Sequence, residues 1–413
     1  MISTQLKFLA SMRSGDFIDG ADIQTEGSFP VYGGNGLRGY TNRCTHSVVA
    51  PLIGRQGALC GNVNFAIGEF YATEHAIVAT PKAGIHPRWL HWTLISLNLG
   101  QYSMAAAQPG LSVDVIEKVR TFKPAFENQE RIANFLDEKT ARIDALIAEK
   151  ERLILALGEW RAAELTRICF GRELPQLKTG NLWIPTLPEG WKPVRLKHLV
   201  PGIEQGWSPD CEGRPAEEDE WGILKAGAAN AGSYRESENK ALPASLEPIQ
   251  ALEVRPGDVL VTRASGTADY VGSFAYVHAT RPKLMLSDKN FRLKFGTAPR
   301  LLPELLAWTC STRNLREQIL QYVSGADGLA KNIGSGKLKE VWLPVPPLEV
   351  QAELIHSLGL RTTQLIGLEN HLKGHIDRLR EYRSSIISAA VTGQFNLDIN
   401  TKHEFGELEC TSA

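Results

Sequence analysis

The chain lacks the features that mark membrane-embedded, secreted and disulfide-stapled proteins. No uninterrupted apolar run reaches the roughly eighteen residues of a transmembrane helix. The 6 cysteines form no CxxC pair, which argues against a disulfide framework and against a structural zinc site. Residues 1–5 carry no charged segment leading into an apolar core, so no secretory signal is predicted. A cytoplasmic location is therefore expected.

The chain also lacks a complete catalytic motif. The run Ile333–Leu338 is similar to a phosphate-binding loop, but Leu338 stands where that loop needs Ser or Thr. His371 and His375 have the spacing of a helical zinc pair, yet Leu372 occupies the position of the catalytic glutamate of zinc proteases. No dinucleotide fingerprint and no amino-methyltransferase (D/N)PP(Y/F) motif is present. We predict that this chain is not an enzyme and holds no metal or cofactor of its own.

What the chain does contain is an internal repeat. Residues 124–171 align without a gap with residues 346–393, at a constant offset of 346 − 124 = 222. Each copy begins after proline, ends at glycine and spaces its apolar residues by threes, fours and sevens. This pattern predicts one long helix per copy, closed by a glycine in left-handed geometry. Because the apolar stripe of such a helix needs a partner, the two helices are expected to pack on each other.

An apolar seam and charged residues beside it recur at this offset. The seam positions are Ile132, Leu136, Ile143, Leu146, Ile154, Leu157 and Trp160 in the first copy, and Leu354, Leu358, Leu365, Leu368, Ile376, Leu379 and Tyr382 in the second. The charged residues that recur beside the aromatic position are Glu159, Arg161, Glu381 and Arg383. These four residues either contact partner subunits or are the solvated flanks of a buried aromatic side chain.

The repeat extends to the segments before the helices, so the repeating unit is a globular domain followed by a long helix. We predict an α+β fold: two β-rich domains, each followed by a long helix, with the helices packed as an antiparallel coiled coil with internal pseudo-twofold symmetry. The predicted segments are domain 1, helix 1, a linker, domain 2, helix 2 and a flexible tail, at residues 1–123, 124–171, 172–187, 188–345, 346–393 and 394–413. Only the second half has the lead-in Leu187–Trp191. Either the first domain lacks this strap or the sequence starts late.

Charge is distributed unevenly although the formal net charge is only −1. Residues 27–68 contain no Asp or Glu, and residues 270–300 contain a single acid, Asp288, among Arg and Lys residues. Such stretches suit the phosphates of nucleic acid. A solvated surface from which acids are absent by chance is the alternative.

Polar residues in or near these stretches are candidate DNA contacts. Arginine pairs well with guanine, and Asn or Gln with adenine, in the major groove. The candidates are Asn35, Arg38, Arg55, Gln56, Asn62 and Asn64 in the first half, and Arg263, Ser265, Lys289, Asn290, Lys331 and Asn332 in the second. The alternative is that the neighbouring glycines form hairpins and the amides cap them.

Five segments of the sequence resemble the specificity subunits of type I restriction-modification systems. They are Tyr32–Tyr40, Ile53–Asn64, Ala72–Ala76, Leu284–Lys289 and Leu343–Gln351. The resemblance implies that the β-rich domains are target-recognition domains, each reading one half of a bipartite double-stranded DNA target, while the helices fix the unread spacer. The first helix start, FKPAFENQ, departs from the proline-rich form of the second.

The resemblance also implies partners. Two modification subunits would dock on the helices and supply S-adenosylmethionine and adenine N6-methylation, and restriction subunits would supply ATP- and Mg-dependent motor and nuclease activity. This chain would determine which DNA sequence is bound and would catalyse no reaction itself. The alternative is a protein-interaction scaffold on a coiled-coil rod that binds no DNA. Genes for an adenine methyltransferase and a helicase-nuclease beside this one would favour the restriction-modification interpretation.

Overall fold

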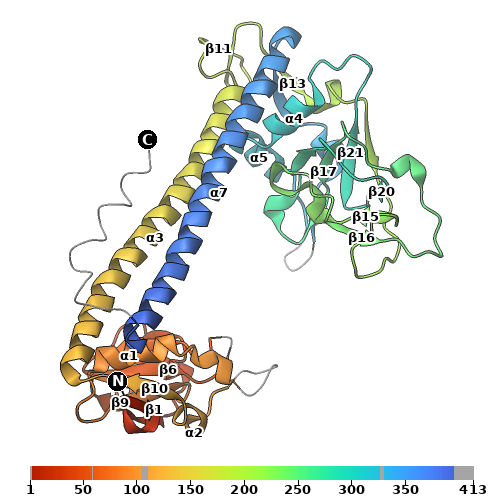
Figure 1. Cartoon of the computed structure of the whole chain (residues 1–413). Coiled ribbons are helices and arrows are strands. Elements are labelled where there is room, and N and C mark those ends of the chain that lie inside the picture. Colours follow the sequence, from red (N-terminus) through yellow and green to blue (C-terminus); the bar gives the residue numbers. More distant parts are fainter. Residues whose placement is uncertain (1, 58, 104–109, 326–329, 395–413) are drawn as a thin grey trace. The chain divides into compact units, whose positions relative to one another are not determined.

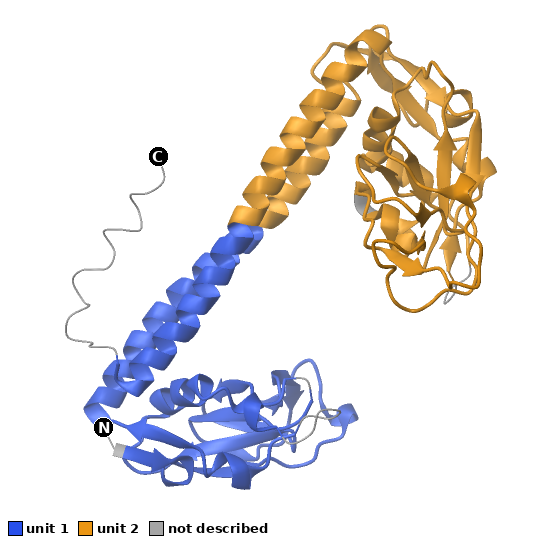
Figure 2. Cartoon of the chain, turned by 45° about the vertical axis from the view of Figure 1, so that its right-hand side comes forward, with its two compact units in different colours: residues 1–152, 372–413 blue, residues 153–371 orange. Residues whose placement is uncertain are grey.

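The computed structural model describes residues 2–57, 59–103, 110–325 and 330–394, which form parts of two compact units (Figure 2). Unit 1 comprises Met1–Arg152 and Leu372–Ala413, and unit 2 comprises Leu153–His371. The division crosses both long helices, so each unit contains one β-rich domain and a part of each helix. The predicted flexible tail lies, from residue 395 on, outside the described residues.

Two long helices, α3 (Phe126–Cys169) and α7 (Leu348–Thr392), lie within the two repeated segments. Gly171 and Gly393 follow their ends with φ of +55° and +73°. The residue after each glycine donates its amide to the carbonyl five residues earlier, at 2.8 and 3.0 Å. The predicted glycine caps are therefore confirmed, because this pattern closes a helix through a left-handed residue.

The helices pack antiparallel in both units (Figure 1). In unit 1, Ile132 and Leu136 from the beginning of α3 share a buried cluster with Ile387 from the end of α7. In unit 2 the order is reversed, since Ile168 from the end of α3 shares a cluster with Leu358 from the beginning of α7. The antiparallel pairing predicted from the repeat is thus confirmed within each unit.

Part of the predicted seam is wrong. Leu146 and its repeat equivalent Leu368 are 46% and 52% exposed, and Trp160 and Tyr382 are each 49% exposed. A two-helix pair buries only the narrow stripe that faces the other helix, so apolar positions at its margin stay in solvent. The same positions are exposed in both copies.

The β-rich domain of unit 1 contains two four-stranded sheets and a two-stranded strap. In strand order, one sheet is β2 (Ala10–Ser14), β9 (Ala76–Pro81), β6 (Ala50–Gly54) and β7 (Val63–Ala66), all antiparallel. The other is β4 (Gly36–Thr41), β3 (Phe29–Gly33), β8 (Glu69–Ala72) and β5 (His46–Ser47), in which β3 and β8 are parallel. The strap pairs β1 (Ile2–Gln5) with β10 (Arg120–Lys123), and the helices are α1 (Pro87–Ser96) and α2 (Val113–Ile116).

The β-rich domain of unit 2 contains a four-stranded and a three-stranded sheet. The first is β14 (Gly202–Gln205), β21 (Asn290–Lys294), β17 (Val259–Thr262) and β19 (Phe274–Tyr276), and the second is β16 (Asn239–Ala241), β15 (Gly222–Leu224) and β20 (Leu284–Met285). Three two-stranded pairs are β11 (Gln176–Lys178) with β12 (Thr186–Pro188), β13 (Lys192–Arg195) with β23 (Trp342–Val345), and β18 (Ala264–Ser265) with β22 (Lys331–Asn332). The short helices are α4 (Pro303–Cys310), α5 (Arg313–Leu320) and α6 (Ser335–Leu338). The α+β class is confirmed.

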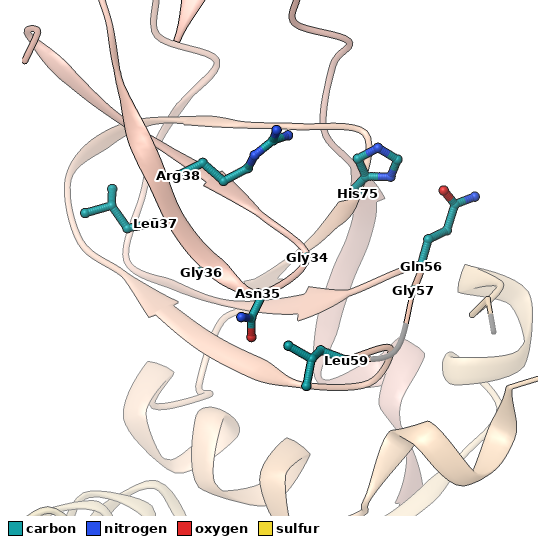
Figure 3. Close-up of a pocket in the computed structure, with 9 residues that line it drawn as sticks. All are labelled: Gly34, Asn35, Gly36, Leu37, Arg38, Gln56, Gly57, Leu59 and His75. Carbon is teal, nitrogen blue, oxygen red and sulfur yellow. The ribbon is translucent and has the colours of Figure 1, made fainter. Parts of the chain in front are cut away.

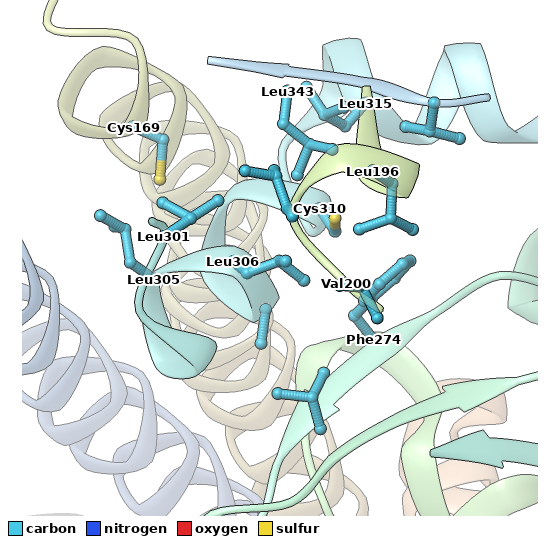
Figure 4. Close-up of a cluster of buried hydrophobic side chains, with 14 of the residues drawn as sticks. Cys169, Leu196, Val200, Phe274, Leu301, Leu305, Leu306, Cys310, Leu315 and Leu343 are labelled. Carbon is cyan, nitrogen blue, oxygen red and sulfur yellow. The ribbon is translucent and has the colours of Figure 1, made fainter. Parts of the chain in front are cut away.

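The two domains have the same backbone hydrogen bond between their first segment and the segment that precedes the long helix. The Leu6 amide donates to the Val119 carbonyl at 2.9 Å, and the Leu196 amide donates to the Val341 carbonyl at 2.8 Å. Leu196 also belongs to the apolar core of unit 2, in which side chains of the domain pack around α4 and the end of α3 (Figure 4). Among the helices that the structure describes, none is both long and apolar enough to cross a membrane.

A buried glutamine ties each domain to its helix. Gln129 Oε1 accepts from the His86 amide at 2.8 Å, and Gln351 Oε1 accepts from the Leu302 amide at 2.8 Å. Each Nε2 donates to two backbone carbonyls, at 3.3 and 3.0 Å for Gln129 and at 2.9 and 3.0 Å for Gln351. Both side chains are fully buried, and both accept from the residue that precedes the first turn of a domain helix, α1 or α4. Residues 129 and 351 are related by the repeat offset, so this device is built twice.

Candidate nucleic-acid interface

An open cavity of about 620 Å³ lies in unit 1 between the β3–β4 hairpin and the loop after β6 (Figure 3). Its lining residues are Gly34, Asn35, Gly36, Leu37, Arg38, Gln56, Gly57, Leu59 and His75. Gly36 has φ of +98°, and a Cβ there would lie 2.9 Å from the Asn64 side-chain oxygen. Glycine therefore lets the hairpin turn tightly against β7.

Three predicted DNA contacts, Asn35, Arg38 and Gln56, line this cavity, and all three are exposed. A fourth, Asn62, donates its Nδ2 to Asn35 Oδ1 at 3.1 Å. The structure thus brings together residues from two loops that are separated by about twenty positions in the sequence. The amide-rich face that results can present both donors and acceptors to base edges.

The other two predicted residues of this half, Arg55 and Asn64, are not among the residues that line the cavity. The Arg55 backbone donates to the His75 carbonyl and accepts from the Leu111 amide, both at 2.8 Å, while its side chain is partly exposed. Asn64 packs beside Gly36, and its Nδ2 is buried without a hydrogen-bond partner among the described residues. Asn64 is therefore better placed to support the hairpin than to reach DNA.

The side chains of Arg38, which lines the cavity, and of Arg55, next to the lining residue Gln56, are not neutralised by the domain. Within the described ranges, no carboxylate lies within ion-pair distance of Arg38 or Arg55. Arg43, from the same acid-free stretch, does pair with Asp22 at 2.6 Å. Arg38 and Arg55 therefore keep their charge available for phosphate or guanine.

In unit 2 the predicted residues gather around the β18–β22 pair. Ser265 lies opposite Lys331 in this ladder, as Ala264 lies opposite Asn332. The Arg263 amide donates to the Lys289 carbonyl at 2.7 Å. The predicted residues brought together here are Arg263, Ser265, Lys289, Lys331 and Asn332.

Asn290 does not belong to this surface. Its side chain is fully buried, and its Oδ1 accepts from Ser287 Oγ at 2.8 Å. It lies on β21, which has a strand on each side and is buried along four of its five residues. The nearby Arg292 is also buried and pairs with Asp258 at 3.2 Å, so it adds no free charge to the basic stretch. We therefore remove Asn290 from the candidate contacts.

The two recurring arginines of the long helices have a role that neither sequence interpretation contained. Arg161 of α3 pairs with Glu369 of α7 at 3.8 Å, and Arg383 of α7 pairs with Asp144 of α3 at 2.8 Å. Both arginines therefore join the helices to each other. Their companions Glu159 and Glu381 are both exposed, and Glu159 also lines an open cavity in unit 2.

Sequence reasoning missed that three pairs of apolar residues related by the repeat are exposed. The pairs are Phe126 and Leu348 (49% and 56% exposed), Leu146 and Leu368 (46% and 52%), and Trp160 and Tyr382 (both 49%). Each unit carries one member of every pair. Apolar character that recurs at the same exposed positions indicates a surface used twice.

A polar cluster attaches α1 to α3 in unit 1. Arg88 forms a two-nitrogen contact with the Asp137 carboxylate, with Nη2 at 2.6 Å, and Trp92 Nε1 donates to the same carboxylate at 2.7 Å. His91, on the same helix, is buried, and burial lowers its pKa to about 4, with Arg88 adding to the shift. The beginning of α1, Pro87–Trp92, resembles the beginning of α4, Pro303–Trp308, which puts Glu304 and Ala307 at the positions of Arg88 and His91, so the described part of unit 2 lacks this cluster.

The fold defines a class: a protein with two different β-rich domains on paired helices. Residues 4–155 match the family model described as the type I restriction modification DNA specificity domain. This match includes the whole cavity of unit 1. The resemblance to type I restriction-modification specificity subunits, predicted from the motifs, is confirmed.

Curated relatives agree with the family model. The type I restriction enzyme EcoprrI specificity subunit of Escherichia coli is 44% identical over 134 residues, which cover 32% of this chain and 33% of that protein. The EcoEI specificity subunit of Escherichia coli is 36% identical over 176 residues, covering 42% of this chain and 29% of that protein. The chain thus matches about a third of the length of these relatives.

The similarity of fold extends further. A chain from a solved structure, which concerns complex assembly and conformational transition of the type I R-M system, aligns with 95% of this chain and 98% of its own length. The TM-score is 0.66 and the sequence identity is 16%. At this sequence identity the similarity supports a shared fold and nothing further.

Proposed function

We propose that this chain is the DNA-specificity subunit of a type I restriction-modification complex. Each β-rich domain reads one half of a bipartite double-stranded target, and the paired helices fix the unread spacer. Two modification subunits carry S-adenosylmethionine and methylate adenine N6, and restriction subunits carry ATP and Mg and cleave unmodified DNA. The chain itself holds neither cofactor nor metal.

One observation carries this proposal. The segment that matches a DNA specificity domain contains a cavity lined by Asn35, Arg38 and Gln56, with no acidic residue among the described lining residues. Amide and guanidinium groups on a basic face suit base edges and phosphates. A scaffold that binds only protein gives no reason for this combination.

Methylome sequencing tests the proposal. A restriction-free host expressing this chain with the modification subunit encoded beside it should acquire one new bipartite motif with N6-methyladenine in both halves. A host expressing the modification subunit alone is the control and should show no such motif. If the subunits form a complex yet no new methylation appears, the non-DNA scaffold becomes the better interpretation.

The duplicated apolar surface supports docking of two modification subunits. We expect Trp160→Glu to remove one modification subunit from the complex, and Trp160→Glu with Tyr382→Glu to remove both. A charge placed in a desolvated apolar contact costs several kcal/mol, which lowers affinity more than about tenfold. Native mass spectrometry of the co-purified complex would measure the stoichiometry.

A matched control exists on the same helix. Leu155 is 71% exposed, and the repeat offset places the polar Asp377 at its equivalent position. Leu155→Asp should therefore leave two modification subunits bound. Circular dichroism should show unchanged helix content in all variants. Retention of both subunits by the double glutamate variant would show that this surface is not the docking site.

A further inference from the structure

Two exposed leucines interrupt the polar face of the unit 1 cavity. Leu37 is 54% exposed and Leu59 is 49% exposed, and both line the cavity with Asn35 and Gln56. Figure 3 shows them projecting from different segments, Leu37 from β4 and Leu59 from the loop after β6. A single exposed leucine is ordinary on a protein surface, but these two line one cavity together with Asn35, Arg38 and Gln56.

The backbone fixes both leucines at the cavity. Leu37 follows Gly36 at the tip of the β3–β4 hairpin, opposite Tyr32 in the strand register. Leu59 sits at a tight turn in which the Cys60 amide donates to the Gly57 carbonyl at 3.0 Å and the Asn62 amide donates to the Leu59 carbonyl at 3.1 Å. These bonds fix the backbone on which each leucine stands, and both leucines line the cavity that Asn35, Arg38 and Gln56 also line.

Base edges offer one partner for an aliphatic group beside an amide. In the major groove, an A·T pair presents the adenine N6 and N7 atoms, which suit Asn or Gln, together with the C5 methyl of thymine, which suits an aliphatic side chain. A G·C pair has no methyl group, since cytosine carries only hydrogen on C5 where thymine carries the methyl. The mixture of amide and leucine therefore matches an A·T pair.

We infer that Leu37 and Leu59 contact a thymine C5 methyl group in the half-site read by the first domain, and so determine specificity there. This inference rests on the proposed function, because it requires that unit 1 read DNA. It names the base pair and the atom recognised, which the proposed function does not.

Replacement of thymine by uracil tests the inference, because uracil pairs identically and lacks only the methyl group. The DNA would be duplexes that contain the motif found by methylome sequencing. In each duplex one thymine of the half-site read by the first domain is replaced by dU. The complex of this chain and its modification subunits would be titrated into each duplex to measure the affinity. Burial of one methyl group is worth about 0.8 kcal/mol, so one dU position should weaken binding about fourfold. The other positions should show no change.

Variants of the leucines then localise the contact. In a complex with both Leu37→Ala and Leu59→Ala, the responsive position should lose its preference, so that dT and dU duplexes bind equally, and each single variant should lower the fourfold ratio. Leu182→Ala, which removes a 97% exposed leucine in unit 2, is the matched control and should retain the fourfold ratio.

Three outcomes would overturn the inference. If no thymine in the half-site responds while the complex still binds its motif specifically, the leucines do not read a methyl group, and the proposed function stands. If the leucine variants instead lose the modification subunits, the leucines belong to a protein interface. If the wild-type complex binds no sequence specifically, the proposed function itself falls, and the inference falls with it.

Discussion

Gln129→Leu should destabilise unit 1 by about 2–6 kcal/mol, because it leaves the half-buried His86 amide and the buried Pro124 carbonyl without a partner, at a cost of about 1–3 kcal/mol each. The Gly84 carbonyl also loses its bond, but Gly84 is exposed and water can take the place of the side-chain amide there. Leucine keeps approximately the volume of glutamine and supplies neither donor nor acceptor. Gln351→Leu should destabilise unit 2 by a similar amount, because the same three bonds exist there.

Hydrogen–deuterium exchange of the full chain would measure this effect locally. In Gln129→Leu, exchange of the His86 amide should accelerate, while the Leu302 amide, in the unaltered copy, should keep its protection. Gln351→Leu should show the reverse. Each copy therefore serves as the internal control for the other.

A surface substitution on α3 is the control for any general effect of mutating this helix. Glu130 is exposed and directly follows Gln129, and the repeat offset places alanine at its equivalent, residue 352. Glu130→Ala should leave both amides protected. Equal protection of His86 in wild type and in Gln129→Leu would show that the glutamine does not hold the domain to its helix.

This pair of glutamines also shows what could be predicted from the sequence. Identity between the copies is sparse, yet residue 129 and residue 351 are both glutamine. The repeat predicts that they have the same environment, but not that each one joins a helix start to a domain helix. Each contact joins two segments that are more than forty residues apart in the sequence. The spacing of apolar residues along a helix does not indicate which distant segment a side chain will meet.

The long helices were predictable because their signals are local. Spacing by threes, fours and sevens and a closing glycine depend only on neighbours along the chain. Exposure of Trp160 was not predictable in this way, since it depends on how wide a stripe the second helix covers. The same applies to Arg161 and Arg383, whose acidic partners lie on the other helix.

The candidate interface divides in the same manner. Asn35, Arg38 and Gln56 were found because glycine-rich, acid-free loops are visible in the sequence, and the structure places them on one cavity. Asn290 was misplaced because its burial comes from pairing with strands on both sides, β14 and β17. Leu37 and Leu59 were missed because an apolar residue in a sequence is expected to be buried, and only the structure shows these two in solvent.

Unit 1 should lose about 3 kcal/mol of stability between pH 6.5 and pH 4 through His91 alone. Burial, reinforced by Arg88 and opposed by Asp137, lowers the pKa of His91 from 6.5 to about 4. Its Nδ1 is buried without a hydrogen-bond partner among the described residues. The folded domain therefore holds this imidazole in its neutral form.

The sign follows from proton uptake. Above pH 6.5 neither state protonates His91, so it contributes no pH dependence. Between pH 6.5 and pH 4 the unfolded chain binds a proton that the folded chain does not, and the free energy of unfolding falls by up to about 1.4 kcal/mol per pH unit. Below pH 4 both states are protonated, and this loss stops growing.

Denaturant unfolding of the full chain at several pH values would test this dependence. His91→Ala, which introduces the residue found at the corresponding position 307, should flatten the slope near pH 5 by about 1.4 kcal/mol per pH unit relative to wild type. Leu94→Ala removes a fully buried side chain from the same helix and is the matched control: it should lower stability at every pH while keeping the wild-type slope. His46, whose pKa is also lowered by burial, is present in all three proteins, so its contribution cancels in the comparison. Identical slopes in wild type and His91→Ala would mean that His91 accepts its proton as readily in the folded domain as in the unfolded chain.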